Sequence, residues 1–383
     1  MRNTLHPYCA FNAKLRANKL LRHLCNSTTY PLDFSTNDYL GLSKHPALIQ
    51  AAQDAACEYG VGNKASRLVM SDQKQIRALE AMIASTKQSQ SALVFNSGYQ
   101  ANISVLSALL DSSVLGSSPL VYSDRLNHAS MHAGCQLAKV KQLRYHHLDY
   151  DHLAFLLAQN KNSKRPQFIL TESVFGMDGD VACLETIIRL AKQYDAFIYV
   201  DEAHATGLFG SKGYGLTQDY AKDIDLTMGT FSKGLGNSGA YVSCSKALKR
   251  FLINKSQGFI FSTAPSPVQI AVMQASWELI PSLQIKAQQL QIQAQDLRLN
   301  LKEMGYDIAN TTTHIIPIIL KTPEKTMRAQ KWLAQNGIRV SAIRSPSVPL
   351  NQCRLRIALS AYHTIDAINI LMNILQKMIH NSF

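Results

Sequence analysis

Long apolar runs are missing from this sequence of 383 residues. No stretch approaches the roughly eighteen consecutive apolar residues that a membrane-spanning helix requires. The opening residues, MRNTLHPYCAFNAK, contain no apolar run that could serve as the core of a signal peptide. Since 46% of the residues are nevertheless hydrophobic, the sequence predicts a globular protein, and its length predicts two domains. We therefore expect a cytoplasmic protein with no membrane partner.

Cysteine is also scarce. The seven cysteines are odd in number, scattered along the chain and never spaced as C-x-x-C. This pattern argues against a disulfide framework and against a zinc site. The sequence therefore predicts no bound metal.

Basic runs interleaved with aromatic residues, which a groove for single-stranded nucleic acid would need, are missing as well. The formal net charge is nevertheless +13, with lysine and arginine spread along the chain. A surplus of this kind favours an anionic partner. We therefore expect an anionic small molecule, such as coenzyme A, or an acidic carrier protein as the partner, and no nucleic acid.

Short apolar runs alternate with helical stretches between about residues 90 and 245, which predicts helices crossing over a largely parallel sheet. The runs predicted as strands are SALVFNSG, LVYSD, QFILTES, FIYVDEAH, DLTMGTFSK and AYVSCS. Functional side chains in such sheets lie at the carboxyl ends of the strands. Beyond residue 265 follows a long helical region that Pro281 bends or divides. After it come short strands, among them IRVSAI (338–343) and CRLRIAL (353–359), and further helices. The expected fold is α/β, with an N-terminal arm at 1–35, a large domain at 36–265 and a smaller C-terminal α+β domain at 266–383.

The segment TFSKGLGNSGA, residues 230–240, has two interpretations. From Gly234 onward it matches G-x-G-x-x-G, the spacing that wraps backbone around a dinucleotide pyrophosphate. That motif must follow a strand and open a helix, with an acidic residue about twenty positions later. Here the strand-like run AYVSCS follows, and the positions twenty or so beyond Gly239 hold Gly258, Phe259 and Ile260. An NAD-dependent dehydrogenase is therefore the weaker interpretation.

Lys233 in the same segment favours pyridoxal phosphate. A lysine packed among small residues must be neutralised, paired or used covalently, because a buried unpaired ammonium is costly. Asp201 ends the apolar run FIYVD, and its carboxylate would pair with the pyridinium nitrogen of the cofactor. His204 could reach the phenolic oxygen of the ring, while Gly98 and the Thr230 hydroxyl would bind the phosphate. The glycines after Lys233 would let the backbone turn closely under the cofactor.

These motifs resemble the α-oxoamine synthases, pyridoxal-phosphate-dependent transferases of fold type I that condense an amino acid with an acyl thioester and release carbon dioxide. The resemblance extends over nearly the whole chain. Its colinear motifs are NDYLGL (37–42), NSGYQAN (96–102), DRLNHAS (124–130), TESVFGMDGD (171–180), VDEAHATGLFG (200–210), TFSKGLG (230–236) and RLRIALSAYHT (354–364). The segment VSAIRSPSVP (340–349) is most similar to the 8-amino-7-oxononanoate synthases, the biotin-pathway branch.

The resemblance implies a role for each matching residue. Lys233 would hold the cofactor covalently and move the α-proton, Asp201 would pair with the pyridine nitrogen, and His128 would stack on the cofactor face. The other cofactor positions are Gly98, Tyr99, Gly176, His204 and Thr230, with Ser262 and Thr263 reaching the phosphate of a partner subunit. Arg356 would bind the substrate carboxylate, and the remaining substrate positions are Asn37, Ser347 and Arg22. The implied assembly is a homodimer that uses L-alanine and a pimeloyl thioester of coenzyme A or acyl carrier protein.

Some positions depart from the family pattern. Gly176 stands where the family has a serine that touches the cofactor, and the loop at 60–80 carries further departures at Lys64, Ala65, Ser71 and Ile76. These departures leave two alternatives open. One is another α-oxoamine synthase that uses glycine or serine with a different acyl thioester. The other is a non-catalytic relative that retains the fold as a binding or scaffolding protein.

Overall fold

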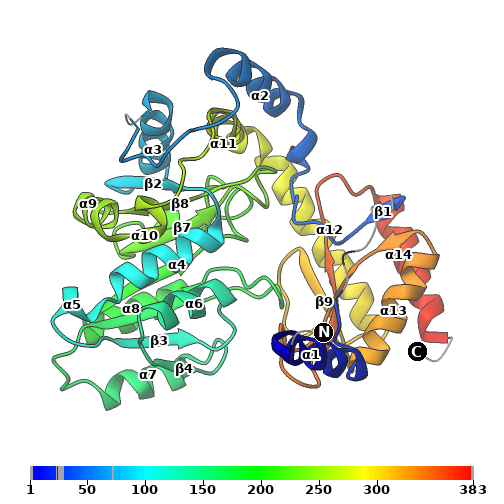
Figure 1. Cartoon of the computed structure of the whole chain (residues 1–383). Helices are drawn as coiled ribbons and strands as arrows, with labels where there is room; N and C mark the ends of the chain where they lie inside the picture. Colours follow the sequence, from blue (N-terminus) through cyan, green and yellow to red (C-terminus); the bar gives the residue numbers. More distant parts are fainter. Residues whose placement is uncertain (1–2, 23, 25–29, 71–72, 381–383) are drawn as a thin grey trace. The chain divides into compact units, whose positions relative to one another are not determined.

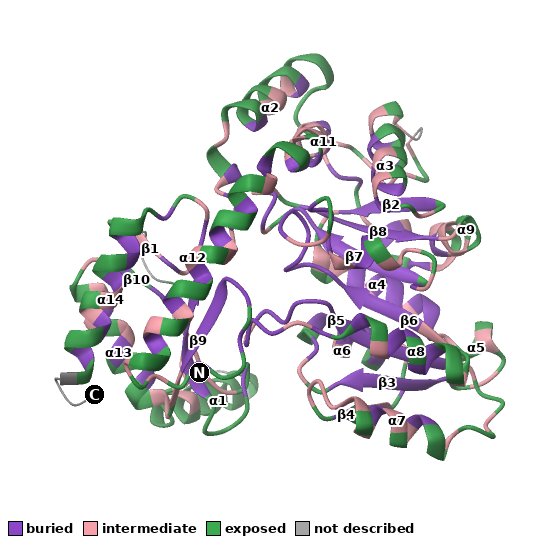
Figure 2. Ribbon diagram, turned by 180° about the vertical axis from the view of Figure 1, so that it is seen from behind, coloured by how far each residue is buried: buried purple, intermediate pink, exposed green. Residues whose placement is uncertain are grey.

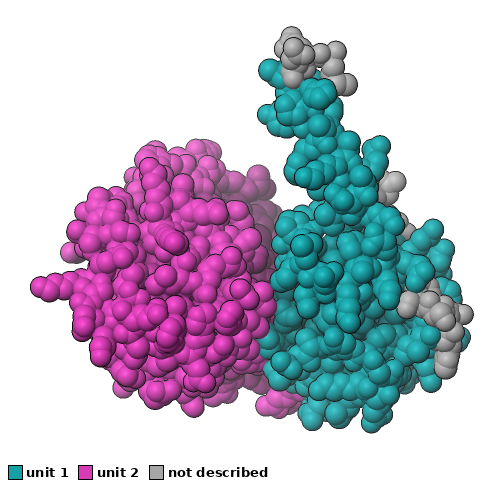
Figure 3. Space-filling model, turned by 90° about the horizontal axis from the view of Figure 1, so that it is seen from below, with its two compact units in different colours: residues 1–36, 177–180, 290–383 teal, residues 37–176, 181–289 magenta. Residues whose placement is uncertain are grey.

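The computed structural model describes residues 3–22, 24, 30–70 and 73–380. The chain divides into two compact units, drawn in different colours in Figure 3. Unit 1 comprises residues 1–36, 177–180 and 290–383, and unit 2 comprises residues 37–176 and 181–289. The domain boundaries expected at residues 35 and 265 stay a prediction. Among the described residues, no helix has the length and apolar character needed to cross a membrane.

Unit 2 is built on a seven-stranded sheet with the order β2-β8-β7-β6-β5-β3-β4 (Figure 1). Every neighbouring pair is parallel except those of β8, which runs antiparallel to both β2 and β7. The predicted, largely parallel sheet is thus confirmed. Its strands are β2 (Ser91–Phe95), β3 (Leu120–Asp124), β4 (Gln142–Tyr145), β5 (Gln167–Glu172), β6 (Ala196–Asp201), β7 (Leu226–Thr230) and β8 (Ala240–Cys244).

Helices cover both faces of this sheet because successive strand residues point to opposite faces. Tyr199 of β6 packs into one apolar core with residues of α4 and α6, whereas its neighbours Ile198 and Val200 pack into a second core with residues of α7 and α8. Figure 2 shows the resulting buried strands. The helices of the unit are α2 (Pro46–Tyr59), α3 (Lys74–Thr86), α4 (Gly98–Leu109), α5 (Ser112–Leu115), α6 (Ala129–Leu137), α7 (Tyr150–Gln159), α8 (Leu184–Tyr194), α9 (Lys246–Lys255), α10 (Gln257–Ile260) and α11 (Pro267–Leu279).

Pro281 divides the long helical region, as its sequence predicts. It lies in a short 3-10 helix, Ile280–Leu283, between α11 and α12 (Gln284–Glu303). Proline has no amide hydrogen and cannot continue the α-helical hydrogen-bond ladder. The N-terminal arm contains α1 (His6–Ala17), which buries none of its residues.

Unit 1 contains an antiparallel sheet with the order β11-β12-β9 and a separate parallel pair, β1 with β10. The predicted strand IRVSAI is split at Val340 into two short strands. The strands are β1 (Leu32–Asp33), β9 (Ile315–Lys321), β10 (Ile338–Arg339), β11 (Ser341–Ile343) and β12 (Cys353–Ala358), and the helices that follow β9 and β12 are α13 (Pro323–Gln335) and α14 (Ile365–His380).

Candidate functional site

The carboxyl ends of β5, β6 and β7 and the N-terminus of α4 bring most of the predicted cofactor residues into unit 2. Ser97 caps α4, and its side chain accepts a hydrogen bond from the Gln100 amide at 3.2 Å. Gly98 follows as the first helical residue, and a methyl group added to it would meet Thr230 and Met228 no closer than 3.8 Å. The free amides of this helix start are therefore next to the end of β7, where they could bind an anion.

Thr230 ends β7 with its side chain buried. Its hydroxyl donates to the Gly239 carbonyl at 2.8 Å and lies 2.8 Å from the Ser232 hydroxyl. Because the single proton of Thr230 is used by Gly239, Ser232 must donate to Thr230. The predicted phosphate-side hydroxyls are thus brought together.

Asp201 is the last residue of β6 and is 3% exposed. One carboxylate oxygen accepts the Ala203 amide at 2.8 Å, and the other accepts the side-chain amide of Asn102 at 2.8 Å. A buried carboxylate with these two donors has a fixed orientation at the sheet edge. It therefore suits a cationic ring nitrogen.

His204 belongs to a buried hydrogen-bonded chain. Its Nδ1 lies 2.7 Å from the Tyr39 hydroxyl, which in turn donates to the Asn37 side chain at 3.0 Å. The other edge of the ring faces Gly176, where an added Cβ would come within 2.3 Å of Nε2. The glycine that departs from the family pattern thus makes room for His204 in its present position.

His128 and Glu172 each interact electrostatically with both Asp201 and Lys233. Burial, opposed by the Asp201 charge and reinforced by Lys233, lowers the pKa of His128. Burial and the Asp201 charge raise the pKa of Glu172 well above its usual range, and Lys233 opposes that rise. Tyr99 places its ring edge-on to that of His128, with the centroids 6.5 Å apart. The predicted catalytic residues of unit 2 therefore share one site.

The glycines after Lys233 are required by the protein itself. A Cβ at Gly234 would lie 2.8 Å from the Thr206 carbonyl oxygen, and one at Gly236 would lie 2.4 Å from the Ser43 amide nitrogen. Gly236 and Gly239 also have positive φ angles, which glycine adopts without strain. Close packing against neighbouring segments thus accounts for these glycines, and their role as clearance for a cofactor stays a prediction.

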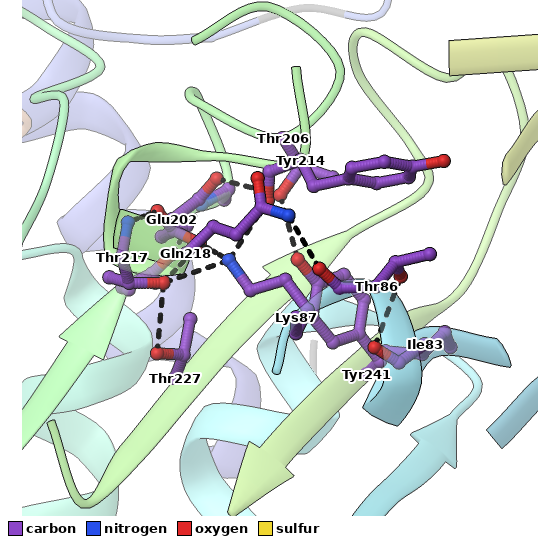
Figure 4. Close-up of polar contacts among 12 residues, drawn as sticks. Ile83, Thr86, Lys87, Glu202, Thr206, Tyr214, Thr217, Gln218, Thr227 and Tyr241 are labelled. Carbon is purple, nitrogen blue, oxygen red and sulfur yellow. Dashed lines mark hydrogen bonds and ion pairs between the residues drawn. The ribbon is translucent and has the colours of Figure 1, made fainter. Parts of the chain in front are cut away.

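A buried ion pair anchors the turn between Asp201 and His204 (Figure 4). The Lys87 ammonium donates to the Glu202 carboxylate at 2.5 Å, and both side chains are almost completely buried. Lys87 also donates to the Thr217 hydroxyl and the Tyr214 carbonyl, at 2.8 and 2.9 Å. All three ammonium protons thus have acceptors, which a buried lysine requires.

Ser262 and Thr263 lie beside the residue that precedes the α4 cap. The Asn96 side chain donates to the Thr263 carbonyl at 2.9 Å and lies 3.4 Å from the Ser262 hydroxyl. Thr263 is exposed and Ser262 is partly exposed. Their role toward the phosphate of a partner subunit stays a prediction.

Unit 1 contains the remaining predicted substrate residues. Arg22 donates to the Ser347 hydroxyl at 2.9 Å, so two positions far apart in the sequence are brought together. Arg356 is 5% exposed in β12, in register with Ser341 of β11 and Pro317 of β9. The carboxylate-binding role of Arg356 stays a prediction.

Four residues of this site could not be recognised from the sequence: Asn102, Glu172, Lys87 and Glu202. Asn102 lies within the quoted motif NSGYQAN, and Glu172 ends a strand, but neither pattern reveals the partner of the side chain. Among the departures at 60–80, Ile76 is a core residue of α3 that is 1% exposed, and Lys64 is exposed. Ser71 lies outside the described residues.

Residues 30–375 match the protein family described as aminotransferase class I and II. The chain belongs to this family. The 8-amino-7-oxononanoate synthase of Gluconacetobacter diazotrophicus is 44% identical over 347 residues, which cover 90% of this chain and 87% of that protein. The enzyme of the same name from Geobacter sulfurreducens is 42% identical over 332 residues, covering 86% and 83%.

The fold of the family is found in serine palmitoyltransferase from Sphingomonas wittichii. That structure matches with a TM-score of 0.90 at 24% identity and covers 99% of this chain and 98% of its own. The predicted resemblance and the predicted fold class, with a large, mostly parallel sheet and a smaller C-terminal part, are confirmed.

Proposed function

We propose that this chain condenses L-alanine with a pimeloyl thioester, releasing carbon dioxide, the free thiol and 8-amino-7-oxononanoate. The observation that carries the proposal is the 44% identity to an 8-amino-7-oxononanoate synthase over 90% of the chain. The product belongs to biotin biosynthesis, for which we expect a cytoplasmic location. We also infer a homodimer. Leu5 at the N-cap of α1, and Tyr8 and Phe11 within α1, are exposed apolar side chains that a second subunit could cover.

The residues at the sheet edge fit pyridoxal phosphate. The α4 N-terminus offers amide donors to the phosphate next to the Thr230 side chain, and the oriented Asp201 carboxylate suits a protonated ring nitrogen. When bound, the cofactor accepts the electron pairs released when the Cα–H and Cα–carboxylate bonds break. Lys233 would hold the cofactor covalently at rest and then move the α-proton of alanine. His204 would reach the phenolic oxygen of the ring.

The other predicted residues would bind and orient the cofactor ring and the two substrates. We assign Tyr99 and His128 to the faces around the ring, and Arg356 to the alanine carboxylate, which a guanidinium binds in bidentate fashion. Asn37 would assist Arg356. The Arg22 and Ser347 pair would contact the acyl donor, on coenzyme A or acyl carrier protein, both of which are anionic.

Thiol release tests the proposed function. Purified protein is assayed with glycine, alanine and serine, each combined with acetyl, succinyl, pimeloyl and palmitoyl thioesters. The expected result is turnover with alanine and the pimeloyl thioester above all other pairs. Turnover confined to glycine or serine would assign another α-oxoamine synthase activity, and no turnover with any pair would favour a non-catalytic relative.

Cofactor binding supplies a second test. The purified protein should be yellow, and Lys233→Ala should abolish the covalent attachment and lower kcat by at least about a hundredfold, because the proton-transfer group is lost. Lys246→Ala, at the exposed start of α9, is the matched control and should leave both properties unchanged. A colourless protein that binds NAD and not pyridoxal phosphate would refute the proposal.

A further inference from the structure

One buried chain of polar side chains joins Asp201 to His128 through unit 2. Asn102 of α4 is its centre and is 1% exposed. The Asn102 amide nitrogen lies 2.8 Å from the Asp201 carboxylate and 2.9 Å from the Ser130 hydroxyl, and the amide oxygen accepts the Tyr199 hydroxyl at 2.7 Å. The Ser130 hydroxyl continues the chain to His128 Nδ1, at 2.6 Å. Three elements, α4, β6 and the start of α6, thus meet in one network.

The Asp201 carboxylate, at one end of this row of side chains, determines which group donates in each hydrogen bond. An ionised carboxylate only accepts, so the atom of Asn102 that faces Asp201 must be the NH₂ group. The amide oxygen therefore faces Tyr199, which donates. The second NH₂ hydrogen then points to the Ser130 hydroxyl oxygen, which consequently accepts from Asn102 and has its own proton available.

That remaining proton determines the protonation of His128. The Ser130 hydroxyl can donate only toward His128 Nδ1, and the Ser130 backbone amide also donates to Nδ1, at 3.3 Å. A ring nitrogen that receives two donors must present its lone pair. In the neutral ring the proton is then on Nε2. Burial lowers the pKa of His128, which favours this neutral ring.

We propose that Asn102 and Ser130 are positioning residues that hold His128 in its Nε2–H tautomer and fix the orientation of the Asp201 carboxylate. The same amide serves both residues, so the protonation of the His128 ring and the orientation of the Asp201 carboxylate are set together. What these two residues do in the reaction rests on the proposed function. The tautomer of His128 is a property of the protein itself and can be measured without turnover.

The test is nitrogen NMR of the full-length protein with labelled histidine, recorded with and without pyridoxal phosphate. His128 signals are assigned by their loss in His128→Asn. We expect an unprotonated Nδ1 and a protonated Nε2 in the unaltered protein. In Ser130→Ala the strongest donor to Nδ1 is removed, and we expect the Nδ1–H tautomer to become detectable.

Asn102→Leu supplies a second measurement, because leucine is close to asparagine in shape but donates to neither Ser130 nor Asp201. We expect it to weaken pyridoxal phosphate binding by roughly tenfold to a hundredfold, the loss that one hydrogen bond to a charged group produces. Ser107→Ala is the matched control on α4, since within the described part of the chain the Ser107 hydroxyl bonds only to the Ser104 carbonyl. It should leave the tautomer and the cofactor Kd unchanged.

A protonated Nδ1 in the unaltered protein would overturn the proposal, and so would an unchanged tautomer in both Ser130→Ala and Asn102→Leu. Thermal unfolding of each variant separates loss of folding from loss of positioning. If Asn102→Leu unfolds, Tyr199→Phe and Ser130→Ala keep the amide in place and still report on each link. Failure of the proposed function would appear differently, as absence of turnover in a protein whose His128 tautomer is as expected.

Discussion

Gly176 packs so closely against the His204 ring that a side chain at position 176 would overlap it. The His204 ring is 7% exposed and is tethered on one side by the Tyr39 hydroxyl. A Cβ at position 176 would overlap the other side. We therefore expect Gly176→Ala to lower the free energy of unfolding by about 1–3 kcal/mol, the usual cost of overpacking. Chemical denaturation measures this change.

Gly98→Ala is the matched control for stability, because its added methyl group would make only ordinary contacts. Tyr39→Phe removes the tether, so the double variant with Gly176→Ala should lose less stability than the sum of the single changes. Strict additivity would show that the His204 tether does not determine the cost at Gly176.

The proposed roles of Lys233, Asp201 and His204 could be inferred from residue type and local pattern, because Asp201 ends the apolar strand β6 and the other two residues follow shortly after the end of such a strand. The role of Asn102 could not be predicted in this way. An asparagine in the middle of a helix is unremarkable in sequence, and its function arises only where α4 crosses the end of β6. The packing of the glycines at 234–239 was likewise hidden, because the groups they approach come from residues 42–43, 206 and 273.

At the scale of elements, Lys87, the residue that follows α3, holds the turn after β6 through its ion pair with Glu202. Glu202 accepts from Lys87 and from both the amide and the hydroxyl of Thr217. We expect Lys87→Met to lower the free energy of unfolding by about 3–5 kcal/mol, because it leaves a buried carboxylate without its cation. Urea unfolding measures the loss, and the cofactor Kd should rise because Asp201 and His204 flank Glu202.

Two variants test this interpretation. Lys192→Met breaks the exposed pair with Asp223, whose atoms lie 2.6 Å apart, and should cost less than about 1 kcal/mol. Lys87→Met combined with Glu202→Gln removes the charge that was left unpaired and should recover part of the lost stability. If the double variant is no more stable than Lys87→Met, the cost does not come from the unpaired carboxylate.

Most elements could be predicted because their apolar runs are long and bounded by turn residues, as in β5, β6 and β7. The edge strand β4 was missed, since QLRY has only two apolar residues and one buried position. The two short strands β10 and β11 were predicted as one.

At the scale of the whole molecule, pattern and length predicted two parts. Which distant segments join each compact unit, such as 177–180 with unit 1, depends on contacts between segments that sequence periodicity does not show.

The stability of the whole chain should depend on pH through His314. This side chain is completely buried in unit 1, and burial, reinforced by the charges of Arg356 and Arg298, lowers its pKa to about 3. Since an unfolded histidine has a pKa near 6.5, the unfolded chain binds the additional proton first as the pH falls. The stabilisation is complete above about pH 6.5 and decreases toward pH 3, by about 2 kcal/mol at pH 5.

Urea unfolding between pH 7 and pH 5 measures this loss, and His314→Gln removes the group that titrates. Its free energy of unfolding should fall less steeply with pH than that of the unaltered chain, whatever its absolute stability. His128 and His363, whose pKa values burial also lowers, contribute equally to both proteins and cancel in the comparison. Parallel pH profiles for the two proteins would show that His314 is not protonated on unfolding in this range, and would place its pKa well above 3 in the folded chain.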